Sequence, residues 1–158
     1  MQLTSLLSLA KTYLDKYQTI WEVDSLENIE KCKAKLLELA DALMDQYHTV
    51  TSVNERIRIL ETLEEISLAV EYNDSDFALE KAAELEDLPD LTYTQRLRLS
   101  WIPDINPDDV SEIVDEILSR PVDEFDIETL LQIINYCTDE DRTRINRLIS
   151  TNTTPILS

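Results

Sequence analysis

Carboxylates are the side chains of this sequence whose number and spacing suggest chemistry, and one stretch has the spacing of a calcium-binding loop. Five oxygen-bearing side chains occupy positions 1, 3, 5, 9 and 12 of a twelve-residue window: Asp104, Asn106, Asp108, Glu112 and Asp115. Asp109 stands where the sharp turn of such a loop needs glycine, Pro107 lies inside the window, and the last ligand is not the bidentate glutamate. We therefore expect no metal site here.

Other groups that catalyse reactions are scarce. His48 is the only histidine, so no histidine-based metal cluster can assemble. Cys32 and Cys137 lie far apart in the sequence, and neither has a CxxC partner or a second histidine to activate its thiol. A catalytic pair of carboxylates needs a cleft that gives the two acids different environments, which a solvated helix face lacks. We expect no catalytic residues, no cofactor and no enzymatic activity.

The carboxylates are concentrated in the middle of the chain. The 158 residues include 33 acidic and 14 basic ones, which gives a net charge of −19. Residues 61–128 hold 21 acidic and four basic residues, a net charge of −17, whereas residues 1–60 carry −2 and residues 129–158 are neutral overall. This charge opposes direct binding to nucleic acid, because the phosphates are negative too.

One predicted helix within the acidic region carries its carboxylates with the least compensation. Asn106 is suited to an N-cap and Pro107 to the first helical position, which starts a helix that runs to about Ser119. Apolar residues follow the spacing of a buried helical stripe, at Val110, Ile113, Val114, Ile117 and Leu118. Acidic residues take most of the remaining positions, so we expect a carboxylate face toward solvent.

We predict that the acidic region contains a partner-binding surface. Carboxylates one helical turn apart are separated by about 6 Å, which is close to the spacing of phosphates along a nucleic-acid backbone and suits a basic groove. The alternative is that the charges only keep the protein soluble. The predicted partner-binding residues are Glu86, Asp87, Asp90, Asp108, Asp109, Glu112, Asp115, Glu116, Asp123 and Glu124.

The absence of glycine indicates the fold class. Average usage of about 7% would give roughly eleven glycines in a chain of this length, and this sequence has none. Glycine supplies the positive φ of tight hairpins and of phosphate-binding loops, so sheet folds and nucleotide-binding folds are disfavoured. Helical spacing of apolar residues recurs along the chain. We predict an all-α, single-domain helical bundle of about seven to eight helices.

Start and stop signals place long helices in the N-terminal part and short helical hairpins in the C-terminal part. Ser52 with Glu55 and Thr138 with Asp141 are predicted caps, and Asp126 is the predicted cap of the second-last helix. The expected helices span about 3–21, 25–48, 52–72, 76–85, 92–102, 107–119, 126–137 and 138–150. The single domain covers 1–150 and includes the acidic region 61–128, and 151–158 is predicted to be a flexible tail.

The composition favours binding over catalysis. No apolar run reaches the roughly 18 residues of a membrane span and no signal peptide is present, so we expect a cytoplasmic protein without a membrane partner.

The leading hypothesis is an acidic module that occupies a basic surface on a partner protein, such as a nucleic-acid-binding protein, as an inhibitor, an adaptor or a nucleic-acid mimic. The alternative is a structural or assembly protein, or a chaperone, that binds through apolar helix faces. In a homodimer the seam would be Leu3, Leu7, Leu14 and Trp21.

Overall fold

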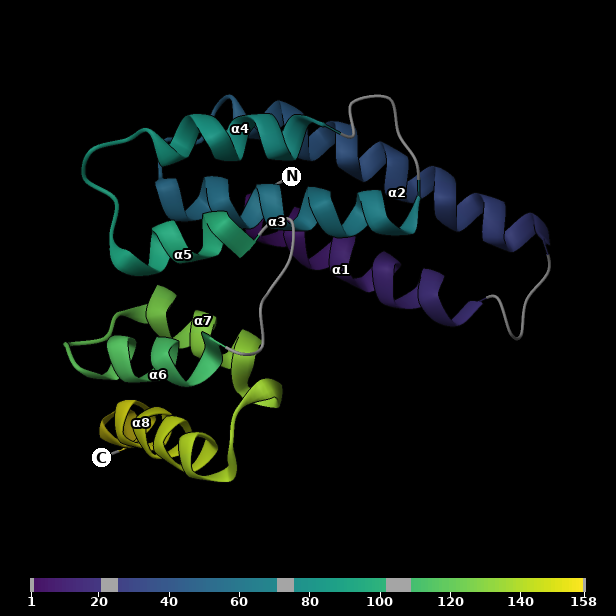
Figure 1. Ribbon diagram of the computed structural model, residues 1–158. Coiled ribbons are helices and arrows are strands. Elements are labelled where there is room, and N and C mark those ends of the chain that lie inside the picture. Colours follow the sequence, from purple (N-terminus) through teal and green to yellow (C-terminus); the bar gives the residue numbers. More distant parts are fainter. Residues whose placement is uncertain (1, 21–25, 71–75, 102–108, 158) are drawn as a thin grey trace. The chain divides into compact units, whose positions relative to one another are not determined.

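The computed structural model of this chain describes residues 2–20, 26–70, 76–101 and 109–157 (Figure 1). These residues form eight α-helices and one 3-10 turn, with no strand among them. The prediction of an all-α helical bundle is confirmed. Contacts divide the chain into two compact units: unit 1 comprises Met1–Leu91 and Gln95–Pro103, and unit 2 comprises Thr92–Thr94 and Asp104–Ser158.

Unit 1 is built on three long helices. They are α1 (Leu3–Ile20), α2 (Leu26–Tyr47) and α3 (Val53–Ala69), followed by α4 (Phe77–Glu86) and by most of α5 (Tyr93–Trp101). Helix α1 packs against α2 and α3, and α3 also packs against α2 and α4, as Figure 1 shows. The long helices therefore belong to the N-terminal part, as the sequence predicts.

Helix α3 is the central element of unit 1. Its apolar residues cover more than one side of the helix, and five of them are buried: Ile57, Ile59, Leu60, Leu63 and Ile66. Burying an aliphatic side chain contributes about 1.5–3 kcal/mol. The wide apolar surface is the reason why α3 packs against three neighbouring helices.

Helix α1 presents one apolar stripe to this core. Leu6, Ala10, Leu14 and Tyr17 are buried at intervals of three and four residues. Leu14 belonged to the seam that the sequence suggested for a homodimer, and the structure places it in the core of unit 1. Trp21 of that seam lies outside the described residues.

Unit 2 contains α6 (Val110–Leu118), α7 (Glu124–Ile133), a 3-10 turn (Ile134–Tyr136) and α8 (Asp139–Leu157). The predicted cap of α8 is confirmed, because the N–H of Asp141 donates to Thr138 Oγ1 at 3.2 Å. The predicted end of α8 is wrong: the helix has 19 residues and includes 151–157, which were expected in a flexible tail. Neither glycine nor proline occurs between 139 and 154, so no residue there stops the helix.

Two other predicted helix starts have different outcomes. Ser52 begins α3 as expected, since its hydroxyl accepts from the N–H of Glu55 at 3.3 Å. The cap of α7 is Asp123, not Asp126 as predicted. Asp123 Oδ1 accepts from the N–H of Asp126 at 2.7 Å, while Asp126 Oδ2 accepts from the N–H of Asp123 at 3.0 Å. This reciprocal box satisfies two backbone donors, which a cap at Asp126 would leave free.

Candidate functional site

Helix α6 has one buried side and one acidic side. Val110, Ile113, Val114 and Ile117 are buried as predicted, whereas Leu118, the fifth residue of the predicted stripe, is half-buried. The solvent side carries Asp109, Glu112, Asp115 and Glu116, which are all exposed and which we call the α6 acidic face. Burial of the apolar stripe is what turns these four carboxylates outward together, because residues three, four and seven apart lie on the same side of a helix.

One cation from another helix partly neutralises this face. Arg144 of α8 places Nη1 at 2.6 Å from Asp115 Oδ1 and at 3.1 Å from Asp141 Oδ1. Hydrogen bonding to Asp115, and then to Asp141, raises the pKa of the Arg144 guanidinium against the opposing effect of its partial burial. Asp141 Oδ2 also accepts from Ser111 Oγ at 3.2 Å, so α6 and α8 are joined by two polar contacts.

The remaining carboxylates of the face have no such partner. Within the described part of the chain, no basic group lies within 4.0 Å of the carboxylates of Asp109, Glu112 or Glu116. Exposed acids on adjacent helical turns repel one another by a few tenths of a kcal/mol per pair. The face is therefore a region of unbalanced negative charge on unit 2.

A shallow hollow of about 390 Å³ lies beside the face. Tyr93 and Ser119 line it together with Glu112, Asp115 and Glu116. Burial raises the pKa of the Tyr93 phenol, and the negative charges of Glu116, Glu112 and Asp109 raise it further, while Arg120 acts in the opposite direction. The phenol thus stays protonated and can donate a hydrogen bond at the edge of a cation-attracting surface.

A polar network in unit 2 holds Tyr93 in this position. The hydroxyl of the next residue, Thr94, donates to Asp126 Oδ1 and accepts from Arg120 Nη2 at 2.9 Å. Thr94 and Asp126 are buried, and Arg120 Nη2 lies 3.7 Å from Asp126 Oδ1. The guanidinium of Arg120 also stacks over the Tyr93 ring, 5.3 Å from its centroid. Sequence analysis missed this network, although Arg120 is the only base between 104 and 128 and so was a candidate for pairing.

The ten predicted partner-binding residues are divided between the two units. Glu86, Asp87 and Asp90 are exposed in unit 1, and the others belong to unit 2. Asp123 has a structural role as the cap of α7, and Asp108 lies outside the described residues. Glu124 is exposed in the first turn of α7. Four of the ten therefore form one surface, the α6 acidic face.

Cys32, Cys137 and His48 contact neighbouring residues in the structure. Cys32 and Cys137 are buried as free thiols, and burial raises the pKa of both. Exposed His48 packs edge-on against Tyr47 and Phe77, with ring centroids 5.9 Å apart in each case. Among the residues that the structure describes, no three of histidine, cysteine, aspartate and glutamate are placed to hold a metal ion.

Comparisons with protein families, with curated proteins and with solved structures find no match to this chain. Within the described ranges, no helix has both the length and the apolar character to cross a lipid bilayer. The α6 acidic face is thus the feature from which a function is inferred.

Proposed function

We propose that this chain is a non-enzymatic protein-binding module that uses the α6 acidic face to occupy a basic surface on a partner protein. The observation that carries this proposal is the exposure of Asp109, Glu112 and Glu116 without a cation within 4.0 Å in the described residues. Their mutual repulsion is relieved when a basic partner supplies the missing positive charges. Binding therefore gains from contacts that the free protein cannot make.

The charge of unit 2 as a whole supports this proposal. Unit 2 has 13 acidic residues, four arginines and no lysine, a net charge of −9. Three of the arginines already contact carboxylates in the same unit: Arg120 with Asp126, Arg142 with Asp139, and Arg144 with Asp115 and Asp141. A surface of one sign steers a partner of the opposite sign and makes association fast and salt-dependent.

The hollow beside the face gives the interaction a point of contact. Tyrosine is enriched at protein interfaces because it combines a large apolar ring with a polar tip. Tyr93 lies next to Glu112 and Glu116, so a lysine or arginine of the partner would meet carboxylates and a phenol in the same hollow. Glu112 and Glu116 are one turn apart, about 6 Å along the helix, and this spacing suits the phosphate-binding groove of a nucleic-acid-binding protein.

Charge reversal on the face tests the proposal. The variant Glu112→Lys/Glu116→Lys leaves the buried stripe and the Arg144 contacts in place. The matched control is Asp41→Lys/Asp45→Lys, which changes the net charge equally at two exposed positions of α2 with the same spacing. We expect capture of a basic protein from the host lysate by the wild type at low salt, weaker capture at high salt, loss of capture by the first variant and retention by the control.

Two results would contradict the proposal. One is affinity for the captured partner that stays constant between low and high salt, because contacts with an acidic face are screened by ions. The other is equal capture by wild type and Glu112→Lys/Glu116→Lys, provided that circular dichroism shows the variant to be folded. The charges would then serve solubility alone.

A further inference from the structure

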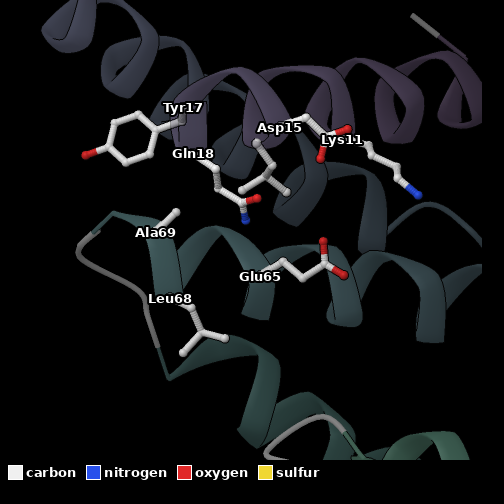
Figure 2. Close-up of a pocket in the computed structure, with 8 residues that line it drawn as sticks. Lys11, Asp15, Tyr17, Gln18, Glu65, Leu68 and Ala69 are labelled. Atoms are coloured by element: carbon white, nitrogen blue, oxygen red, sulfur yellow. The ribbon is translucent and has the colours of Figure 1, made fainter. Parts of the chain in front are cut away.

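Unit 1 contains a hollow of about 330 Å³ between α1 and α3 that has no part in the function proposed above (Figure 2). Helix α1 contributes Lys11, Leu14, Asp15 and Gln18 to its lining, and α3 contributes Glu65 and Leu68. The volume is near the lower limit for ligand sites in proteins, which run from about 300 to 1,000 Å³. It fits one side chain or a small organic group.

Three polar side chains in the lining of the hollow are Asp15, Gln18 and Glu65. Among the described residues, the side chains of Asp15, Gln18 and Glu65 make no hydrogen bond, and no basic group lies within 4.0 Å of either carboxylate. Figure 2 shows Gln18 pointing from α1 toward α3, with Asp15 and Lys11 on α1 and Glu65 on α3. Two carboxylates thus face one hollow with incomplete compensation.

The electrostatic environment of Glu65 agrees with this geometry. Partial burial raises the pKa of Glu65, and the nearby charges of Glu61 and Asp15 raise it as well. Lys11 acts in the opposite direction but does not cancel these effects. A cation placed in the hollow would therefore relieve an unfavourable charge on Glu65.

The hollow also has apolar surface without a partner. Leu14 is buried and forms part of its floor, whereas the Leu68 side chain is 80% exposed at its rim. An exposed leucine beside two carboxylates is a surface suited to an amphipathic group. Lysine and arginine have this character, since they lay an aliphatic stem on apolar surface and direct a charged head to a carboxylate.

We propose that this hollow binds a lysine or arginine side chain of a protein partner, with the aliphatic stem against Leu14 and Leu68 and the cationic head between Asp15 and Glu65. Charge complementarity selects this occupant: an acidic side chain would be repelled, and a purely apolar one would leave both carboxylates unpaired. Gln18 contributes an amide oxygen as a further acceptor for the head. The site lies in unit 1 and is independent of the α6 acidic face.

Three peptides of the form acetyl-Ala-X-Ala-amide provide the test, with X as arginine, lysine or norleucine. Norleucine retains the aliphatic stem and lacks the charge. Each is titrated into the full-length ¹⁵N-labelled protein, and amide shifts are followed by NMR. We expect saturable shifts of residues in 11–18 and 65–69 with the arginine and lysine peptides. Glu65→Gln should weaken this binding about tenfold or more, the effect of one charge-assisted hydrogen bond.

Glu30→Gln is the matched control, because it removes the same charge from an exposed position of α2 and should leave the titration unchanged. The proposal is overturned if the norleucine peptide binds as tightly as the arginine peptide, or if no shift saturates in 11–18 and 65–69. It is also overturned if sedimentation shows a dimer that Leu68→Ser abolishes, since a second copy would then cover the hollow. Shifts confined to 109–119 would sink this proposal and leave the function of the α6 acidic face standing.

Discussion

Arg98 of α5 and Glu61 of α3 form a buried ion pair in unit 1. Arg98 Nε donates to Glu61 Oε2 at 3.1 Å, and Arg98 Nη2 donates to Glu61 Oε1. The Arg98 side chain is 1% exposed and that of Glu61 is 18% exposed. A guanidinium is removed from water only where hydrogen bonds and an opposite charge replace its hydration. This pair, together with the hydrogen bond from Gln95 Nε2 to Asn54 Oδ1, links α5 to α3.

Removing one member of this pair should destabilise unit 1 strongly. We expect Glu61→Ala to lower the free energy of unfolding by about 3–5 kcal/mol, because it removes two hydrogen bonds and an opposite charge from a buried guanidinium. Urea denaturation followed by circular dichroism measures the change. Glu27→Ala breaks the exposed Lys31–Glu27 pair on α2 and should change stability by less than about 1 kcal/mol. Similar losses in both variants would show that Arg98 is solvated.

The double variant Arg98→Met/Glu61→Leu separates charge burial from packing. Apolar residues of similar size can replace a buried ion pair with little loss, and sometimes with a gain. We expect the double variant to be more stable than Glu61→Ala. If both are equally unstable, the loss comes from packing around α5 and not from the lost contact between the two charges.

The network around Asp126 should be the most sensitive polar site of unit 2. Asp126→Ala removes the acceptor of the Thr94 hydroxyl, the partner of Arg120 and half of the capping box of α7. We expect a loss of about 2–4 kcal/mol in the free energy of unfolding. Asp123→Ser, which retains an oxygen at the cap position, should lose much less. Equal effects of the two variants would mean that only the cap matters.

The raised pKa of Glu65 predicts a pH dependence of stability. Its folded-state pKa lies above the ordinary value of 4.5, mainly through partial burial and then through Glu61 and Asp15. The folded state therefore holds this proton more tightly than the unfolded state, and stability falls as pH rises from about 4.5 through the folded-state pKa. Glu65→Gln should remove this fall, so its advantage over the wild type should grow with pH and then stay constant.

Urea titrations of both proteins at a series of pH values measure this difference. Glu80→Gln serves as the reference for the general effect of removing one negative charge from unit 1. A difference between Glu65→Gln and wild type that is flat across the whole pH range would contradict the raised pKa.

Arg144 should weaken partner binding through its contact with the acidic face. Arg144→Gln frees the carboxylate of Asp115 and makes unit 2 more negative by one charge. We expect faster association with the captured basic partner at low salt and little difference at high salt, as measured by stopped-flow fluorescence. Arg147→Gln is the control, because this exposed arginine of α8 has the same charge. Equal acceleration by both variants would point to net charge, and not to the α6 acidic face, as the cause.

The sequence predicted which segments are helical and which side of each helix is buried, because both depend on the local spacing of apolar residues. The predicted stripe at Val110, Ile113, Val114, Ile117 and Leu118 follows from the helical period alone, and the structure buries all of it except Leu118, which is half-buried. The start of α7 was not predictable from the same rules, since Asp123 and Asp126 are both good caps. Only the reciprocal hydrogen bonds between them, within a helix that packs in unit 2, make Asp123 the cap.

The sequence by itself determined that this protein is all-helical and that its negative charge is concentrated in 61–128, because composition and helical spacing are local properties. Tertiary structure alone decided which charges remain unpaired. Glu61 and Asp115 lie in the same acidic region as Glu112 and Glu116, yet the first two contact arginines 37 and 29 positions away, while the other two have no base within 4.0 Å among the described residues. The physical reason is that an ion pair depends on distance in space, and the partners in Arg98–Glu61 and Arg144–Asp115 meet only when helices pack.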